Sequence, residues 1–157
     1  MENLSSRLLT SIYLALVFYC IGAIMIENEV NYRTWLLVGA EEFPAFHTTF
    51  DELLFPFFKL PLALCLFFSF LLMAIKPPRK YLLIYIVNFA VLTYFLGISL
   101  WLQVPIHEQL NEQHSTGQIL KLIDNNRLYR SPAVVLMLVS NFYLLYVSID
   151  RRNSTTV

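Results

Sequence analysis

The chain has 157 residues, of which 57 % are apolar and only 14 % are charged, whereas an average soluble domain has about 25 % charged residues. Its formal net charge is zero, which gives no electrostatic basis for binding nucleic acid or another polyanion. This composition excludes an ordinary soluble domain and indicates one integral membrane domain, residues 1–157.

The apolar residues gather in four blocks, each long enough to form one membrane-spanning helix. At a rise of about 1.5 Å per residue, roughly 20 residues cross a hydrocarbon core of about 30 Å. We therefore predict an all-α integral membrane four-helix bundle with a short helical cap on its extracytoplasmic side. The spans are expected at about 8–26, 56–75, 81–104 and 132–149. The first block is too long for a signal peptide and lacks a small-residue cleavage site, so we expect it to be a span.

The connection before the second span carries the first part of the predicted cap, residues 40–55. Its apolar residues recur at a helical period, and Pro44 suits a first helical turn. We expect this helix to continue into the second span with kinks at Pro56 and Pro61. His47 and Asp51 are four residues apart and share one face, and Glu42 precedes them by about a turn and a half.

The third span is followed by the second part of the cap, residues 106–125. The spacing aligns Ser99, Gln103, His107 and Asn111 on one face of the third helix. Pro105 cannot donate to the carbonyl of residue 101, so we expect a kink at residues 101–103. The helix is predicted to end at about residue 114 and to be followed by a short amphipathic helix at 118–125.

Charge separates the two ends of the predicted bundle. The connections 27–54 and 103–131 hold nine of the eleven carboxylates. The basic residues at the opposite helix ends are Arg7, Lys76, Arg79, Lys80, Arg151 and Arg152. Because Lys and Arg favour the cytoplasmic side, we expect both termini in the cytoplasm and the protein in a plasma or bacterial inner membrane. Residues 151–157 are predicted to be a flexible tail.

Other polar residues fall inside the predicted spans. Cys20 and Cys65 are expected to behave as small apolar residues and not as a disulfide framework. Asn88 and Asn141 need hydrogen-bond partners in lipid, which predicts an amide pair between helices. Lys59 near the outer edge is the only acidic or basic residue expected within a span, which argues against an ion or proton transporter.

Because both long connections are predicted on one side, His47 with Asp51 or Glu42 could face His107 with Gln103 or Asn111. Two imidazoles and a carboxylate, here His47, His107 and Glu42, could bind a divalent transition metal. The same groups without a metal could act as a general base and its orienting partner. A third interpretation is that both histidines only meet water or headgroups where their helices leave the bilayer.

Two stretches carry a family resemblance, WLQVPIHEQLNEQ and LIDNNRLYRSP. They resemble the anthrone oxygenase-like family of small four-span membrane proteins, whose third helix ends in an aliphatic-Pro-aliphatic-polar motif and whose last span opens with an Asn-x-x-x-Arg stretch. The matching positions, all in the second half of the chain, are Val104, Pro105, Ile106, His107, Leu110, Asn126 and Arg130. The resemblance implies oxidation of a lipophilic substrate by molecular oxygen.

The first functional hypothesis is therefore an oxidoreductase or oxygenase-like enzyme acting on a small lipophilic molecule at the outer mouth of the bundle. The candidate catalytic residues are His107, His47, Asp51 and Glu42. The candidate substrate-binding residues are Gln103, Asn111, Trp101, Arg130 and Asn126, with Arg130 holding a carboxylate or an enolate-like oxygen.

The alternatives are a non-catalytic membrane protein whose cap docks a partner or a lipid, and a metal-binding membrane protein. The expected cofactor is none or a divalent transition metal. The expected partners are the lipid bilayer and a small lipophilic molecule, with a homo-oligomer left open.

Overall fold

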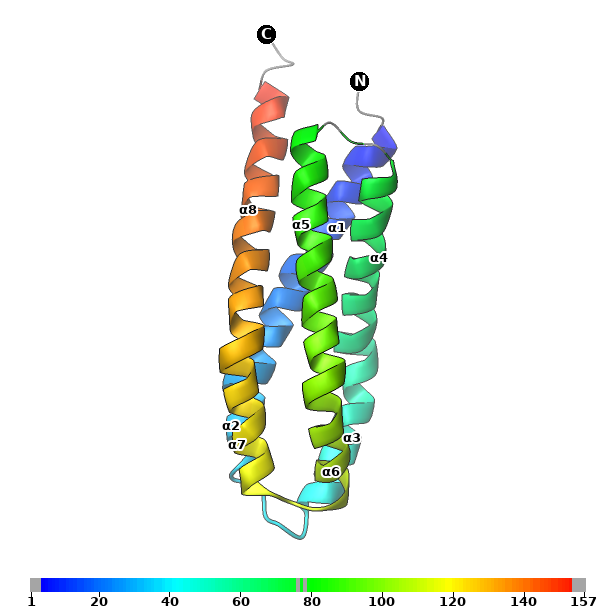
Figure 1. Cartoon of the computed structure of the whole chain (residues 1–157). Coiled ribbons are helices and arrows are strands. Elements are labelled where there is room, and N and C mark those ends of the chain that lie inside the picture. Colours follow the sequence, from blue (N-terminus) through cyan, green and yellow to red (C-terminus); the bar gives the residue numbers. More distant parts are fainter. Residues whose placement is uncertain (1–3, 76, 78, 154–157) are drawn as a thin grey trace.

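The structure, a computed structural model, describes residues 4–75, 77 and 79–153 and consists there of helices joined by short turns, without strands (Figure 1). The chain forms four long helices, each interrupted by one π-helical turn. In chain order the elements are α1 (Leu4–Ile26), η1 (Glu27–Asn31) and α2 (Tyr32–Trp35); α3 (Phe43–Leu54), η2 (Phe55–Lys59) and α4 (Leu60–Ala74); α5 (Arg79–Ile98), η3 (Ser99–Gln103) and α6 (Val104–Glu112); and α7 (Thr116–Asn125), η4 (Asn126–Arg130) and α8 (Ser131–Asn153). The predicted all-α four-helix bundle is confirmed.

Helix α1 begins and helix α8 ends at one end of the bundle, and α2, α3, α6 and α7 form the other, which we call the capped end (Figure 1). The predicted cap segments are not separate from the spans, because each continues a long helix. The first helix also runs beyond residue 26 to Trp35, so the predicted connection 27–54 shortens to residues 36–42. The third helix ends at Glu112, because Gln113 has extended backbone angles.

The last helix is longer than predicted at its carboxyl end. Helix α8 continues to Asn153, so residues 151–153 of the predicted flexible tail are helical. Residues 154–157 of that tail and Lys76 of the predicted basic turn lie outside the described residues.

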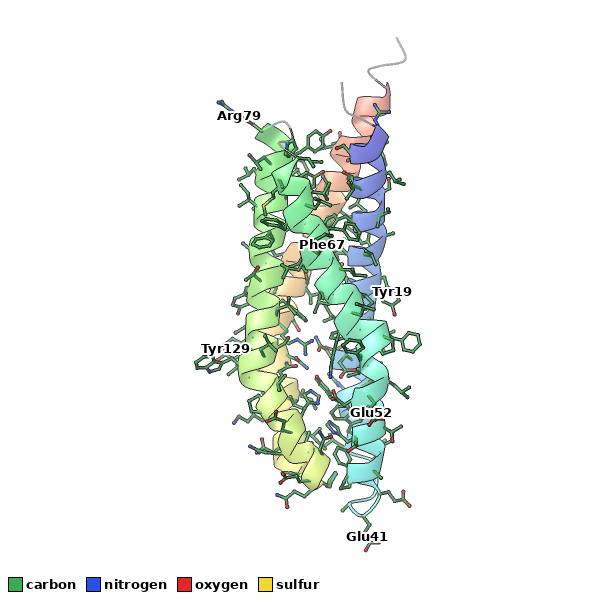
Figure 2. All side chains as sticks on the ribbon, turned by 90° about the vertical axis from the view of Figure 1, so that its right-hand side faces the viewer. Tyr19, Glu41, Glu52, Phe67, Arg79 and Tyr129 are labelled. Atoms are coloured by element: carbon green, nitrogen blue, oxygen red, sulfur yellow. The ribbon has the colours of Figure 1, made fainter. Side chains whose placement is uncertain are left out.

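All four long helices are apolar enough and long enough to cross a membrane. Their most apolar stretches have mean hydropathies of 1.9 to 2.2, yet only 22 % to 33 % of the residues in those stretches are buried. Many large apolar side chains are therefore exposed on the outside of the bundle, as Tyr129 is in Figure 2. A bundle in water would expose such a surface at a high cost, whereas lipid accommodates it, so the fold fits a small integral membrane protein.

The core of the membrane-length part is formed by α1, α4, α5 and α8. Within it, Asn88 and Asn141 donate to each other through their side-chain amides, at 3.1 Å in both directions, which confirms the predicted amide pair. The sulfur atoms of Cys20 and Cys65 lie 3.6 Å apart as free, buried thiols, so no disulfide joins them.

The π-helical turns lie between the membrane-length helices and the capped end. Each adds one residue to a helical turn, and such insertions frequently mark functional sites. Proline explains three of them, because Pro61, Pro105 and Pro132 each lie two residues beyond a π-helical turn. Pro105 follows η3, where the kink was predicted, and Pro61 has no N–H for the carbonyl of Phe57, which instead accepts a 2.7 Å hydrogen bond from the Tyr19 hydroxyl.

Candidate functional site

A group of buried polar side chains lies where the π-helical turns meet the capped end. Its members come from all four long helices and are Glu27, Asn28, His47, Gln103, Asn126 and Arg130. A small apolar core closes the bundle around them on the capped side: Tyr32, Trp35, Phe43, Ile106, Leu110, Ile119 and Leu122. Buried polar groups need partners, so their hydrogen bonds determine what the site can do.

The two histidines are in direct contact. His47 Nε2 on α3 and His107 Nδ1 on α6 are 3.1 Å apart, and His47 is fully buried. The indole of Trp35 packs edge-on against both rings, with ring centroids 4.8 Å from His47 and 5.7 Å from His107. A hydrogen bond between two imidazole nitrogens needs a lone pair on one of them, so at least one ring is neutral.

Their partners determine the direction of this bond. His47 Nδ1 lies 2.7 Å from Asn111 Oδ1, an acceptor, so this nitrogen donates and His47 Nε2 accepts from His107 Nδ1. His107 Nε2 then carries a lone pair, 3.3 Å from the hydroxyl of Tyr32. The chain runs Tyr32 to His107 to His47 to Asn111, with one proton in each link.

Arg130 is the charged centre of the site. It is 2 % exposed, and its Nη1 donates to Gln103 Oε1 and, at 2.9 Å, to Asn126 Oδ1. Its guanidinium carbon lies 4.5 Å from the ring centroid of Phe95, a cation–π contact. Gln103 Nε2 also donates to Asn126 Oδ1. Arg130 Nε and Asn126 Nδ2 are buried without a partner, so the site has unused donors.

Glu27 is a buried carboxylate in the same region, placed there by η1. It is 3 % exposed and accepts a 2.7 Å hydrogen bond from Asn31 Nδ2. Glu27 and Tyr32 fall within the predicted connection 27–54, so neither was predicted as a site residue. The available signal was the spacing of Ile24, Glu27 and Tyr32, which continues the buried face of the first helix at steps of three to five residues.

A cavity of about 340 Å³ joins these groups, within the range of small-molecule sites. Its polar wall contains Glu27, Tyr32, Gln103, His107 and Arg130. Its apolar wall contains Leu54, Phe58, Leu62, Leu96, Leu100 and Val104. Ser99, Asp51, Lys59, Glu108 and Asn111 complete the lining.

Of the predicted site residues, Glu42 and Trp101 lie outside the cavity, and Asp51 lines it without bonding to His47. Asp51 pairs with Lys59 at 2.8 Å, so the partner of His47 Nδ1 is Asn111 instead of a carboxylate. Glu42 is exposed where α3 begins. Trp101 is 83 % exposed and does not line the cavity. The structure thus brings together His47, His107, Gln103, Asn111, Asn126 and Arg130.

The predicted metal ligands are not gathered. Among the residues that the structure describes, no three His, Cys, Asp or Glu side chains are placed to hold an ion together. The predicted set of His47, His107 and Glu42 is therefore not assembled, and both ring nitrogens of His47 are engaged in hydrogen bonds.

Comparisons with protein-family models, with curated proteins and with solved structures find no match to the chain. The fold and the site therefore define its class: a four-helix bundle with membrane-length apolar helices and a buried polar cavity near one end.

Proposed function

We propose that this protein binds a small lipophilic molecule in the cavity and removes a proton from it, with His107 Nε2 as the base. The observation that carries the proposal is the hydrogen-bond chain, which leaves a lone pair on this nitrogen at a cavity wall that also contains Arg130. A base and a cationic hydrogen-bond donor in one apolar enclosure suit proton removal next to a carbonyl group.

Each residue has a defined part in this reaction. Arg130 holds the carbonyl oxygen and stabilises the negative charge that it gains in the enolate. His107 Nε2 takes the carbon-bound proton, while the proton on its Nδ1 moves to His47 Nε2. The positive charge thereby lies on His47, whose Nδ1 still donates to Asn111 Oδ1. The Tyr32 hydroxyl can free His107 Nε2 by donating its hydrogen bond to Gln103 Oε1 instead, 3.4 Å away.

The resemblance to the anthrone oxygenase-like family extends the proposal to an oxidoreductase or oxygenase-like enzyme, in which the enolate is oxidised by molecular oxygen. Proton removal comes first in that reaction, so it can be tested without any oxidant.

The test is hydrogen–deuterium exchange of a lipophilic ketone. The purified protein in lipid nanodiscs is mixed with 2-tetralone in deuterated buffer, and deuterium uptake next to the carbonyl is followed by mass spectrometry. We expect wild-type protein to accelerate exchange over empty nanodiscs and His107→Gln to lower the acceleration at least about a hundredfold, the usual contribution of a general base. His114→Gln is the matched control, because His114 does not line the cavity.

Equal exchange rates for the wild-type and His107→Gln proteins would overturn the proposed role of His107. Binding of the ketone without any acceleration would instead favour the non-catalytic alternative, a membrane protein that only holds a lipophilic ligand.

A further inference from the structure

One side of the cavity is apolar and faces the surroundings of the bundle. Leu100 and Val104 on the third long helix line the cavity and are 66 % and 40 % exposed. Leu54 and Phe58 on the second long helix, both half-buried, line it opposite them. We call these four residues the window. Its edges consist of aliphatic and aromatic side chains that lipid contacts without cost.

The second and third long helices lie side by side near Arg79, and they separate between the levels of Tyr129 and Glu52 (Figure 2). The window residues belong to η2 and η3 or directly adjoin these turns. The ion pair of Asp51 and Lys59 lies beside it toward the capped end. A charged pair next to an apolar opening is the arrangement expected just below the headgroup level of a membrane.

The wall behind the window carries one acidic and one basic side chain that do not pair with each other. Glu27 and Arg130 both line the cavity, and among the described residues no ion pair links them. Each is instead bonded to neutral amides, and Arg130 Nε has no partner. Buried charges are costly unless paired, so a ligand that offers one group to each of them would gain the most.

We infer that the cavity, in the ligand-binding role proposed above, takes up an amphiphile sideways from the bilayer through the window. The polar end of this molecule carries an anionic or carbonyl oxygen for Arg130 beside a hydroxyl or ammonium donor for Glu27. Its apolar part lies along Leu62, Leu96 and the window and extends toward lipid, so the length of the chain is not limited by the cavity.

The protein provides its own reporter for this ligand class. Trp35 packs against His107 at the cavity, and Trp101 is the only other tryptophan, so Trp101→Phe leaves a single tryptophan, which lies beside the site. In nanodiscs, energy transfer from Trp35 to the polyene fatty acid cis-parinaric acid measures occupancy. Dodecanoic acid and 2-hydroxydodecanoic acid then compete for the site, each dosed by its mole fraction in the membrane.

We expect the hydroxy acid to displace the probe at a roughly tenfold lower mole fraction than the plain acid, because it adds a hydrogen bond to a charged group. Glu27→Gln should reduce this preference while plain dodecanoic acid still competes, which shows that the variant is folded. Equal potency of the two acids on wild-type protein would overturn the pairing with Glu27.

The route is tested by stopped-flow mixing with the same probe. Narrowing the window with Leu100→Phe and Val104→Phe together should slow association and release by a similar severalfold factor, because an obstacle on a path raises the barrier in both directions. Leu128→Phe with Val135→Phe is the matched control, since these residues are 65 % and 59 % exposed and do not line the cavity. Unchanged rates in the window variant would overturn entry from the bilayer.

This inference and the proposed function can fail separately. If ketone exchange depends on His107 but the two acids are equally potent, the proposed proton transfer stands and the proposed ligand class is overturned. If the hydroxy acid is preferred but no ketone exchange is seen, the proposed ligand class stands and the proposed proton transfer is overturned.

Discussion

The properties of the His47–His107 pair depend on the neutral acceptor at its far end. Asn111 Oδ1 accepts from His47 Nδ1 at 2.7 Å and so assigns a proton to that nitrogen. A carboxylate in the same place would also favour a second proton on the ring. With an amide, the relay stays neutral at rest and the lone pair remains on His107 Nε2, where the proposed reaction needs it.

Asn111→Leu should therefore lower ketone exchange by roughly tenfold, less than the loss of the base itself, with little change in probe affinity. The substitution removes the acceptor that assigns the tautomer of His47, which nitrogen chemical shifts of the two rings report directly. Asn111→Asp restores an acceptor and should recover part of the exchange.

Thr48→Val is the control for Asn111→Leu. Thr48 Oγ1 also donates to Asn111 Oδ1, but at 3.4 Å and on the exposed side, so its loss should leave exchange within about twofold of wild type. Unaltered ring spectra in Asn111→Leu would show that the amide does not determine the tautomer.

At the scale of single residues, the sequence predicts which side chains share a helix face better than it predicts which side chains pair with each other. Spacing of four residues correctly aligned Gln103, His107 and Asn111, and placed His47 on a helix opposite them. The same rule paired His47 with Asp51, but Asp51 instead pairs with Lys59, eight residues later on the same helix. Partner choice depends on how far each side chain can reach, which the helical period alone does not contain.

At the scale of elements, the π-helical turns bring the polar side chains into the bundle. Gln103, Asn126 and Arg130 belong to η3 and η4, and Glu27 belongs to η1. An added residue rotates the helix beyond it by about 100° at 3.6 residues per turn, which changes the face that is buried. The site is therefore a product of these turns as much as of its residues.

Pro105→Ala should return η3 toward a regular α-helix, because residue 105 gains an N–H for the carbonyl of residue 101. Gln103 would then rotate away from Arg130, and probe binding should weaken at least about tenfold through the loss of a hydrogen bond to a charge. Thermal stability, followed by circular dichroism, should not fall, since alanine favours the helix.

Pro44→Ala is the matched control, because Pro44 is in the first turn of α3, where no helical bond is missing. Binding that survives Pro105→Ala would mean that packing against η4, and not the proline, holds Gln103 in place.

Proline made two of these turns, η2 and η3, predictable from the sequence and left the other two hidden. The kink near residues 101–103 was expected from Pro105, whereas η1 contains no proline and was assigned to a connection. The pattern of buried residues in the first helix continues across η1 with one residue added. A strict helical period in the sequence therefore ends at Ile26. Extension to Trp35 becomes evident only from its packing with α7 and the histidines.

At the scale of the whole molecule, outward-facing apolar helices and the charge pattern were readable from the sequence because both are properties of composition along the chain. The cavity was not, because it forms between four helices that are distant in sequence. The sequence suggested that His47 and His107 are close only because both connections were expected on one side of the membrane. The structure places α3 and α6 in contact at the capped end.

The side of the membrane on which the cavity lies can be measured by cysteine labelling. In a Cys20→Ser and Cys65→Ser background, Gly39→Cys places a thiol in the exposed loop at the capped end, where an added side chain meets only Glu42 Oε2 at 4.0 Å. Arg79→Cys places one at the opposite end. Because basic residues gather at that end, an impermeant maleimide should label Gly39→Cys on intact cells and Arg79→Cys only after permeabilisation.

The reverse pattern would place the capped end in the cytoplasm, and the amphiphile proposed for the cavity would then come from the cytoplasmic leaflet. Wild-type protein, whose two cysteines are buried, is the control for labelling of native thiols. The labelling result therefore determines which leaflet supplies the ligand, because the window is on the capped side of the membrane-length helices whichever way the bundle is inserted.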